Sequence, residues 1–474
     1  MALVGWSEQT QPGCCEKWSS AVRWKRLGPA AVIAVFVWEL AAVGVAADEP
    51  AARAFLNAHI IPIEGEEIER GVMIVRDGRI EAIGHVDDLA VPRGAQRVDL
   101  AGRILMPGLI CTHSHIGGIG GADRSGPIQP DVRVYDSINV RDAGFRRAVA
   151  GGLTTLNIMS GSGHLMSGQT VYVKLRGAET IDDLLIHDED GWIMGGMKMA
   201  NGTNPIRDRA AFPGSRARAA SLMRQFFIRA QEYRDRHARA GEDESKRPSR
   251  DIGMDAMIEV LEGRRIVHFH THRHDDIMTV LRLAKEFDFR VVLHHVSDGW
   301  AVADEIAAAG VPNSIILIDA PGGKLEAKHL ILETAGIMEK AGAKIAFHTD
   351  DYITDSRLFF RMAALGVRGG MSRDGALRAL TINGAKMMDL QDRIGSLEPG
   401  KDADFIVLDG DPLSVYTKVL ETWVEGERVF DRSDEKDHLH AVGGYGAGYD
   451  QMPYFCCFQQ SMSALIQQQS GGQQ

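Results

Sequence analysis

The sequence predicts an α/β fold built around a closed barrel of eight parallel strands, and three features of residues 107–390 support this. Apolar runs of strand length alternate with helical patterns, as in βαβ units. Eight such runs are enough for a (β/α)8 TIM-like barrel, and side chains able to bind metals follow several of them. The expected strands are 109–113, 153–159, 170–175, 192–199, 266–270, 290–295, 314–318 and 345–350.

The composition is that of a globular enzyme or binding protein of ordinary polarity. Of the 474 residues, 45% are hydrophobic and 25% are charged, which provides ample material for a buried core. The formal net charge of -11 argues against binding to duplex nucleic acid, because such proteins need a basic face that neutralises phosphates. Small or peptide-like substrates fit this charge better.

Residues 1–47 have the pattern of an export signal or of an N-terminal membrane anchor. Basic residues precede an apolar stretch at 27–45, and small residues end it just before Asp48. Cleavage there would deliver the mature protein to the periplasm or to the outside of the cell. Without cleavage, the stretch is close to the roughly 20 residues that span a bilayer, so the chain would stay membrane-anchored.

Both ends of the chain predict β-structure outside the barrel. Residues 48–106 contain short alternating segments, and Asp77-Gly78 between two apolar runs is a hairpin signal. Residues 391–432 have the same character, so the simplest arrangement is one small antiparallel domain completed by both ends. The Gln-, Ser- and Gly-rich residues 433–474 are expected to form a poorly ordered, low-complexity tail.

The first barrel strand carries two histidines with a spacing suited to metal binding. Pro107-Gly108 is a turn signal that would start a new strand at Leu109. The strand period of two then places His113 and His115 on one face, where both can bind the same ion. Taken alone, the pair could equally be two polar residues at the end of a strand.

Other strands also end in potential ligands, and their number favours a metal site. Each residue has an ordinary explanation by itself, such as a helix N-cap or a histidine bonded to a carbonyl group. Six of them at converging strand ends are better explained by a metal-binding active site. They are His113, His115, Lys198, His270, His295 and Asp350.

The motifs that contain these residues resemble the amidohydrolase superfamily, in its imidazolonepropionase-like branch. The resemblance covers residues 52–432. It rests on the Pro-Gly-Leu-Ile and His-Ser-His run at 107–115, Gly-Leu-Thr-Thr at 152–155, and the segments 198–205 and 267–277. It also includes His-His at 294–295, Thr-Asp at 349–350 and Gly-Lys-Asp-Ala-Asp at 400–404.

The resemblance implies a metal-dependent hydrolase in which a small β-sandwich, formed by the N- and C-terminal segments, accompanies the barrel. It implies that His113, His115 and Asp350 bind one divalent ion, zinc or another transition metal. His270 and His295 would bind a second ion. In two-metal members, a lysine at the position of Lys198 is carbamylated and bridges both ions, which requires a neutral amine. In one-metal members it would only form hydrogen bonds, and both forms stay open.

Several neighbouring histidines are expected to play other roles. His272, after the fifth strand, and His164, in the Gly- and Ser-rich loop 160–169, are candidates for substrate binding. If His295 points inward, strand alternation makes His294 face the surrounding helices. His348 would lie one layer below Asp350 and support the ligands from behind.

The resemblance further implies hydrolysis of a carbon–nitrogen bond, in a non-peptide or dipeptide amide, by attack of metal-bound hydroxide. Asp350 would move the proton from the attacking water to the leaving nitrogen. The alternatives are a deaminase or a lactone or ester hydrolase on the same scaffold, or a catalytically silent exported binding protein. The expected partner is a small molecule or dipeptide, and homo-oligomerisation stays open.

Overall fold

The computed structural model describes residues 52–119, 123, 125–208, 211–317, 324–351 and 353–443. The predicted export signal or anchor at 1–47 and most of the predicted tail lie outside these residues. Among the helices that the structure describes, none has the length and apolar character needed to cross a bilayer.

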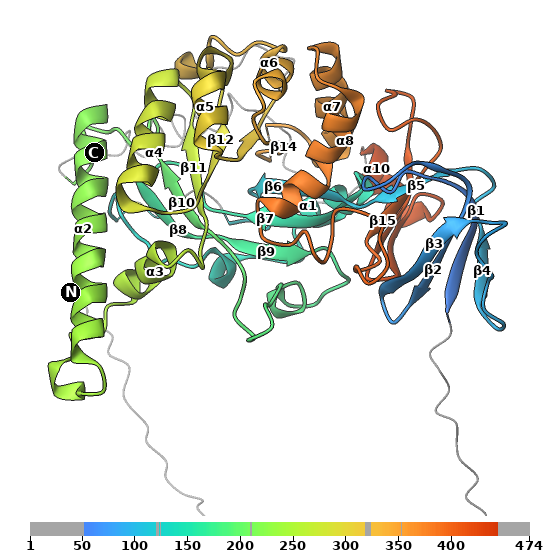
Figure 1. Cartoon of the computed structure of the whole chain (residues 1–474), viewed down its shortest axis with the longest axis horizontal. Coiled ribbons are helices and arrows are strands. Elements are labelled where there is room, and N and C mark those ends of the chain that lie inside the picture. Colours follow the sequence, from blue (N-terminus) through green and yellow to red (C-terminus); the bar gives the residue numbers. More distant parts are fainter. Residues whose placement is uncertain are drawn as a thin grey trace, which may run out of the picture. The chain divides into compact units, whose positions relative to one another are not determined.

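Strands from the two ends of the chain form one mixed sheet (Figure 1). Its centre is the antiparallel pair of β5 and β15, in which Met106 lies opposite Ile406. Strands from both ends of the chain therefore share one sheet. The strands are β1 (Arg53–Ile60), β2 (Ile68–Arg76), β3 (Arg79–His85), β4 (Gln96–Asp99), β5 (Ile104–Pro107), β15 (Phe405–Leu408), β16 (Val419–Val424) and β17 (Glu427–Asp431).

The hairpin predicted at Asp77-Gly78 is confirmed. Strands β2 and β3 pair antiparallel on either side of it, with Arg76 opposite Arg79. Asp77 has φ +50° and Gly78 has φ +74°, so both central residues adopt the left-handed conformation. This conformation suits Asp-Gly, and its twist matches that of the two strands.

The middle of the chain supplies two further sheets made mainly of parallel strands. Strands β10 to β14 pair in parallel in sequence order, and β6 pairs in parallel with β7. The described strands therefore establish a mixed α/β fold. Their bounds are β6 (Leu109–Ser114), β7 (Leu153–Ile158), β10 (Met197–Ala200), β11 (Val267–Thr271), β12 (Val291–His295), β13 (Asn313–Ile315) and β14 (Ile345–Phe347).

The expectation that the third barrel strand runs parallel to its neighbours is wrong. The segment forms β8 (Met166–Gln169) and β9 (Val171–Lys174), with only Thr170 between them. Strand β8 pairs antiparallel with β10, and β9 pairs antiparallel with β7. The connection from β7 to β9 at 159–170 contains β8 and no helix, so it lacks the crossover helix that usually joins parallel strands. One bent segment thus contacts both sheets.

Helices follow most of the parallel strands, and their apolar faces pack against the sheet. The long helix α2 begins at the N-cap Ser215 and buries apolar side chains that include Phe227 and Ala230. The helices are α1 (Ala143–Ala150), α2 (Arg216–Ala240), α3 (Ile252–Leu261), α4 (His274–Phe287), α5 (Ala303–Ala309), α6 (Thr334–Lys340), α7 (Phe359–Arg368), α8 (Arg373–Leu380) and α9 (Ile382–Lys386).

The start of the predicted low-complexity tail is helical, which corrects the boundary placed at residue 433. Helix α10 (Glu435–Val442) begins at the N-cap Asp434, whose side chain accepts hydrogen bonds from two backbone N–H groups. Asp437 on this helix also forms an ion pair with Arg146 on α1. Helix capping and this ion pair stabilise a helix here despite the polar composition of the segment.

A buried lysine joins β9 to the C-terminal part of the mixed sheet. The Nζ atom of Lys174 lies 2.5 Å from Asp402, 3.1 Å from Asp404 and 3.1 Å from Glu425. Burial opposes the charge on this amine, but the three carboxylates outweigh it and raise the pKa of Lys174. The cluster therefore holds a charged lysine in the interior.

We expect Lys174→Met to lower the free energy of unfolding by about 3–5 kcal/mol, because it leaves buried carboxylates without their cation. The control is Lys418→Met, which removes a half-exposed lysine 3.8 Å from Asp409 and should cost less than about 1 kcal/mol. Urea unfolding of both variants measures the difference. Equal stability of the two variants would show that the buried cluster contributes nothing.

Candidate metal centre

The end of β6 brings His113 and His115 together as strand alternation predicts. Their Nε2 atoms lie 3.1 Å apart. The turn before β6 depends on Gly108, because a Cβ atom there would lie 2.3 Å from the side chain of Thr154. This close contact lets β6 pack directly beside β7 and fixes where the two histidines emerge.

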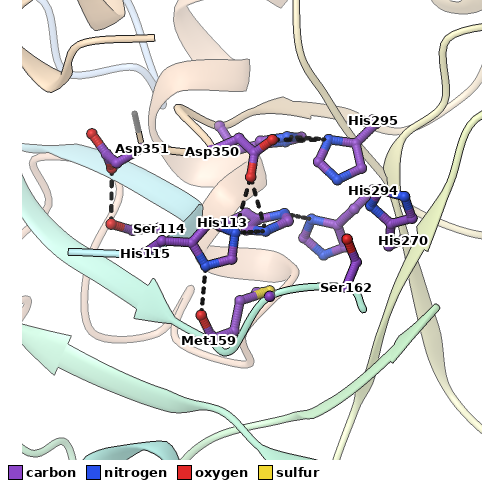
Figure 2. Close-up of polar contacts among 12 residues, drawn as sticks. His113, Ser114, His115, Met159, Ser162, His270, His294, His295, Asp350 and Asp351 are labelled. Atoms are coloured by element: carbon purple, nitrogen blue, oxygen red, sulfur yellow. Dashed lines mark hydrogen bonds and ion pairs between the residues drawn. The ribbon is translucent and has the colours of Figure 1, made fainter. Parts of the chain in front are cut away.

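Asp350 completes a compact group of three potential ligands (Figure 2). Its Oδ1 atom lies 3.0 Å from Nε2 of His115 and 3.4 Å from Nε2 of His113. Ligand atoms arranged tetrahedrally at 2.0–2.1 Å from a zinc ion are about 3.3 Å from one another. The three residues therefore have the spacing and the donor atoms of a divalent metal site.

The orientation of His115 also suits metal binding. Its Nδ1 atom lies 2.6 Å from the carbonyl oxygen of Met159, which can only accept a hydrogen bond. Nδ1 therefore carries the proton, and Nε2 presents a lone pair towards Asp350. This arrangement is the usual one for metal-binding histidines, whose second nitrogen donates to a nearby acceptor.

The charge state of Asp350 is set by its neighbours. Burial opposes its ionisation, but favourable electrostatic interactions with the nearby His115, His348 and Lys198 outweigh burial and hold its pKa well below the usual range. Asp350 is therefore a carboxylate at neutral pH. A carboxylate in this position can serve as a metal ligand or as a proton acceptor.

A second group of possible ligands lies next to the first. His270, His272 and His295 each direct a ring nitrogen to within 4.8 Å of the others, and all three are buried. His295 connects the two groups, because its Nδ1 atom lies 3.8 Å from Oδ2 of Asp350. The ring of His272, a predicted substrate contact, stacks on His295 and hydrogen bonds to Ser297.

Lys198 lies beside the first group and is fully buried. Its Nζ atom is 3.1 Å from Nε2 of His113 and 3.1 Å from the sulfur of Met159. Burial lowers the pKa of Lys198 to about 7, so much of this amine is neutral near pH 7. The structure thus brings together all six residues predicted to form the metal site.

The expectation that His294 faces the surrounding helices is wrong. Its Nδ1 atom lies 3.2 Å from Nδ1 of His113. His295 has φ +71° and Val296 has φ +51°, so the regular alternation of β12 ends at His295. Both adjacent histidines can therefore reach the interior.

His164 is not part of either ligand group. It is buried, and its ring lies 5.5 Å from that of Phe212. The loop that carries it is also shorter than predicted, because residues 166–169 form β8. Its role in substrate binding stays a prediction.

Two residues near the centre were not identified from the sequence. Asp351 accepts hydrogen bonds from Ser114, Thr349 and Ser356, and so ties the end of β6 to the segment after β14. Lys324 places Nζ 3.1 Å from Nε2 of His270. Asp351 could have been found from its position next to Asp350, whereas Lys324 comes from a long loop whose path no sequence pattern predicts.

The chain matches a known protein family and is similar to several known proteins. Residues 236–430 match the model of the amidohydrolase family. The chain is 26% identical over 396 residues to amidohydrolase tasK of Hapsidospora irregularis, covering 77% of this chain but only 39% of that protein. It is 26% identical to imidazolonepropionase of Aromatoleum aromaticum, with 74% and 89% of the two chains covered.

A solved structure gives the strongest likeness among these matches. An amidohydrolase from Thermotoga maritima superposes with a TM-score of 0.75 and 32% identity, covering 80% of this chain and all of that one. The chain belongs to the amidohydrolase superfamily, among its imidazolonepropionase-like members.

Proposed function

We propose that this protein is a metal-dependent hydrolase that cleaves a carbon–nitrogen bond in a small molecule or dipeptide. The observation that carries the proposal is the group formed by His113, His115 and Asp350, whose ligand atoms lie 3.0–3.4 Å apart. The parallel strands and the family support a (β/α)8 barrel as its scaffold, with a β-sandwich formed by the chain ends.

The residues of the centre have distinct tasks in such a reaction. A bound divalent ion such as zinc would lower the pKa of water to about 7 and polarise the substrate carbonyl group. Asp350, ionised and 3.0 Å from His115, is placed to accept the proton of the attacking water and pass it to the leaving nitrogen.

The second histidine group supports a site for two ions. His270 and His295 would hold the second ion, and Lys198 would bridge both as a carbamate. The neutral form of this buried amine is the one that reacts with CO2, and burial favours it. In the one-metal alternative, Lys198 would only form hydrogen bonds.

We expect Asp350→Asn to reduce kcat by at least about 10²-fold, because the amide cannot accept the proton. Most of the metal should stay bound, since both histidines remain. Steady-state kinetics and elemental analysis of the same sample measure the two effects. Asp409→Asn, at an exposed position, serves as the control, and normal turnover in Asp350→Asn would contradict the proposed role.

Removal of metal with a chelator should abolish activity, and zinc should restore it. If Lys198 bridges two ions, the wild-type protein binds two ions per chain only when bicarbonate is present during reconstitution. Lys198→Ala should then lose at least one of them. A single ion in the wild-type protein, or loading independent of bicarbonate, would contradict the carbamate.

The substrate can be identified by screening the metal-loaded protein against amides, dipeptides, deaminase substrates, lactones and esters. We expect turnover of an amide or dipeptide. Ammonia release from an amino-heterocycle would instead identify a deaminase, and cleavage only of lactones or esters would identify that alternative. A metal-free protein without activity would support a silent binding protein.

The N-terminal pattern bears on where the protein is located. We infer export to the periplasm or cell exterior, with cleavage near Ala47. Fractionation of cells followed by N-terminal sequencing tests this inference. A mature chain beginning at Met1 in the membrane fraction would support the anchor instead.

A further inference from the structure

A row of buried rings extends from the candidate metal centre into the interior of the protein. Nδ1 of His113 lies 3.2 Å from Nδ1 of His294, and Nε2 of His294 lies 2.9 Å from Nδ1 of His268. Nε2 of His268 in turn lies 2.9 Å from the hydroxyl oxygen of Tyr172. All four side chains are almost completely buried, so these contacts replace water as hydrogen-bond partners.

We propose that His294, His268 and Tyr172 form a hydrogen-bonded relay that orients His113 and sets its tautomer for metal binding. The proposal rests on the proposed function, because it assigns Nε2 of His113 to a metal ion. It makes His294 a positioning residue that acts through His113. It also gives a role to three buried polar side chains that the hydrolytic reaction does not use.

The direction of the relay follows from the chemistry of neutral imidazole, which has one donor and one acceptor nitrogen. Nε2 of His113 faces His115 and Asp350, so metal binding there requires its proton to be on Nδ1. That proton is then donated to Nδ1 of His294. The next donation passes from Nε2 of His294 to Nδ1 of His268.

The last donation in the relay passes from Nε2 of His268 to the oxygen of Tyr172, which accepts it. In the opposite direction, the tyrosine hydroxyl would donate and Nε2 of His113 would be protonated. That second state is incompatible with a metal ion on Nε2. Metal binding therefore selects one of two hydrogen-bonding directions, and a relay that lacks an acceptor should weaken binding.

The backbone of β12 makes the contact possible. Strand β12 pairs with β11 so that His294 lies opposite His270, while the left-handed conformation of His295 turns the chain immediately afterwards. His294 can therefore contact His113, while His295 lies near Asp350. A fully regular strand could not direct both adjacent side chains inward.

The test is the zinc affinity of purified variants, measured by competition with a chromophoric chelator. His294→Phe keeps a ring but removes the acceptor for His113, and we expect roughly 10- to 100-fold weaker binding. His294→Asn retains an oxygen near the position of Nδ1 and should recover part of this loss. Tyr172→Phe removes only the terminal acceptor and should weaken binding in the same direction by a smaller factor.

Val292→Ala is the matched control, because this fully buried residue lies on the same strand in a separate apolar cluster. It should lower thermal stability and leave zinc affinity unchanged. Circular dichroism establishes that each variant is folded. Should His294→Phe not fold, Tyr172→Phe and His294→Asn still test the relay.

The outcomes separate the relay from the proposed function. If the wild-type protein binds zinc and the folded His294 and Tyr172 variants bind it within about twofold of wild type, the relay is wrong and the hydrolase proposal stands. If the wild-type protein binds no divalent ion, both proposals fail. If Val292→Ala weakens zinc binding as much as the His294 variants do, His294 has only an ordinary packing role.

Discussion

The candidate site depends on one constraint, which is that many imidazole rings lie close together and most of them are buried. Buried polar atoms need partners, and here the ring nitrogen that faces away from the centre has one in several cases. His115 contacts the carbonyl of Met159, His113 contacts His294, and His272 contacts Ser297. In each of these histidines, the other ring nitrogen is therefore available to face the groups of potential metal ligands.

The surrounding fold maintains this geometry through a few close contacts. Gly108 allows β6 to lie against Thr154, and Asp351 ties Ser114 to the segment after β14. The bent segment of β8 and β9 contacts both sheets of the middle region, and Lys174 at its end is bonded to the C-terminal carboxylates. The ends of the chain therefore help to stabilise the strands that carry the metal ligands.

Much of the site could be predicted because it follows from strand alternation and from motif position. The shared face of His113 and His115 is a consequence of period two, and the hairpin at Asp77-Gly78 is a consequence of turn chemistry. The position of His294 could not be predicted in this way, because the left-handed backbone at His295 leaves no mark in the composition of β12.

The reversed third strand has a related explanation. The composition predicts a strand, but strand direction depends on the length and path of the connection. The sequence predicts a loop at 160–169, whereas residues 166–169 form β8. Lys324 was missed because its contact with His270 spans a long loop. Local patterns predict which residues form a strand or hairpin, whereas long-range contacts decide how those elements face each other.

We propose above all that His113, His115 and Asp350 bind a divalent metal ion. The most direct measurement is an anomalous difference map, collected at the zinc absorption edge, from crystals of the zinc-loaded protein. We expect a strong peak between the Nε2 atoms of both histidines and a carboxylate oxygen of Asp350. An ordered site without a peak at that position, in protein crystallised with excess zinc, would contradict it.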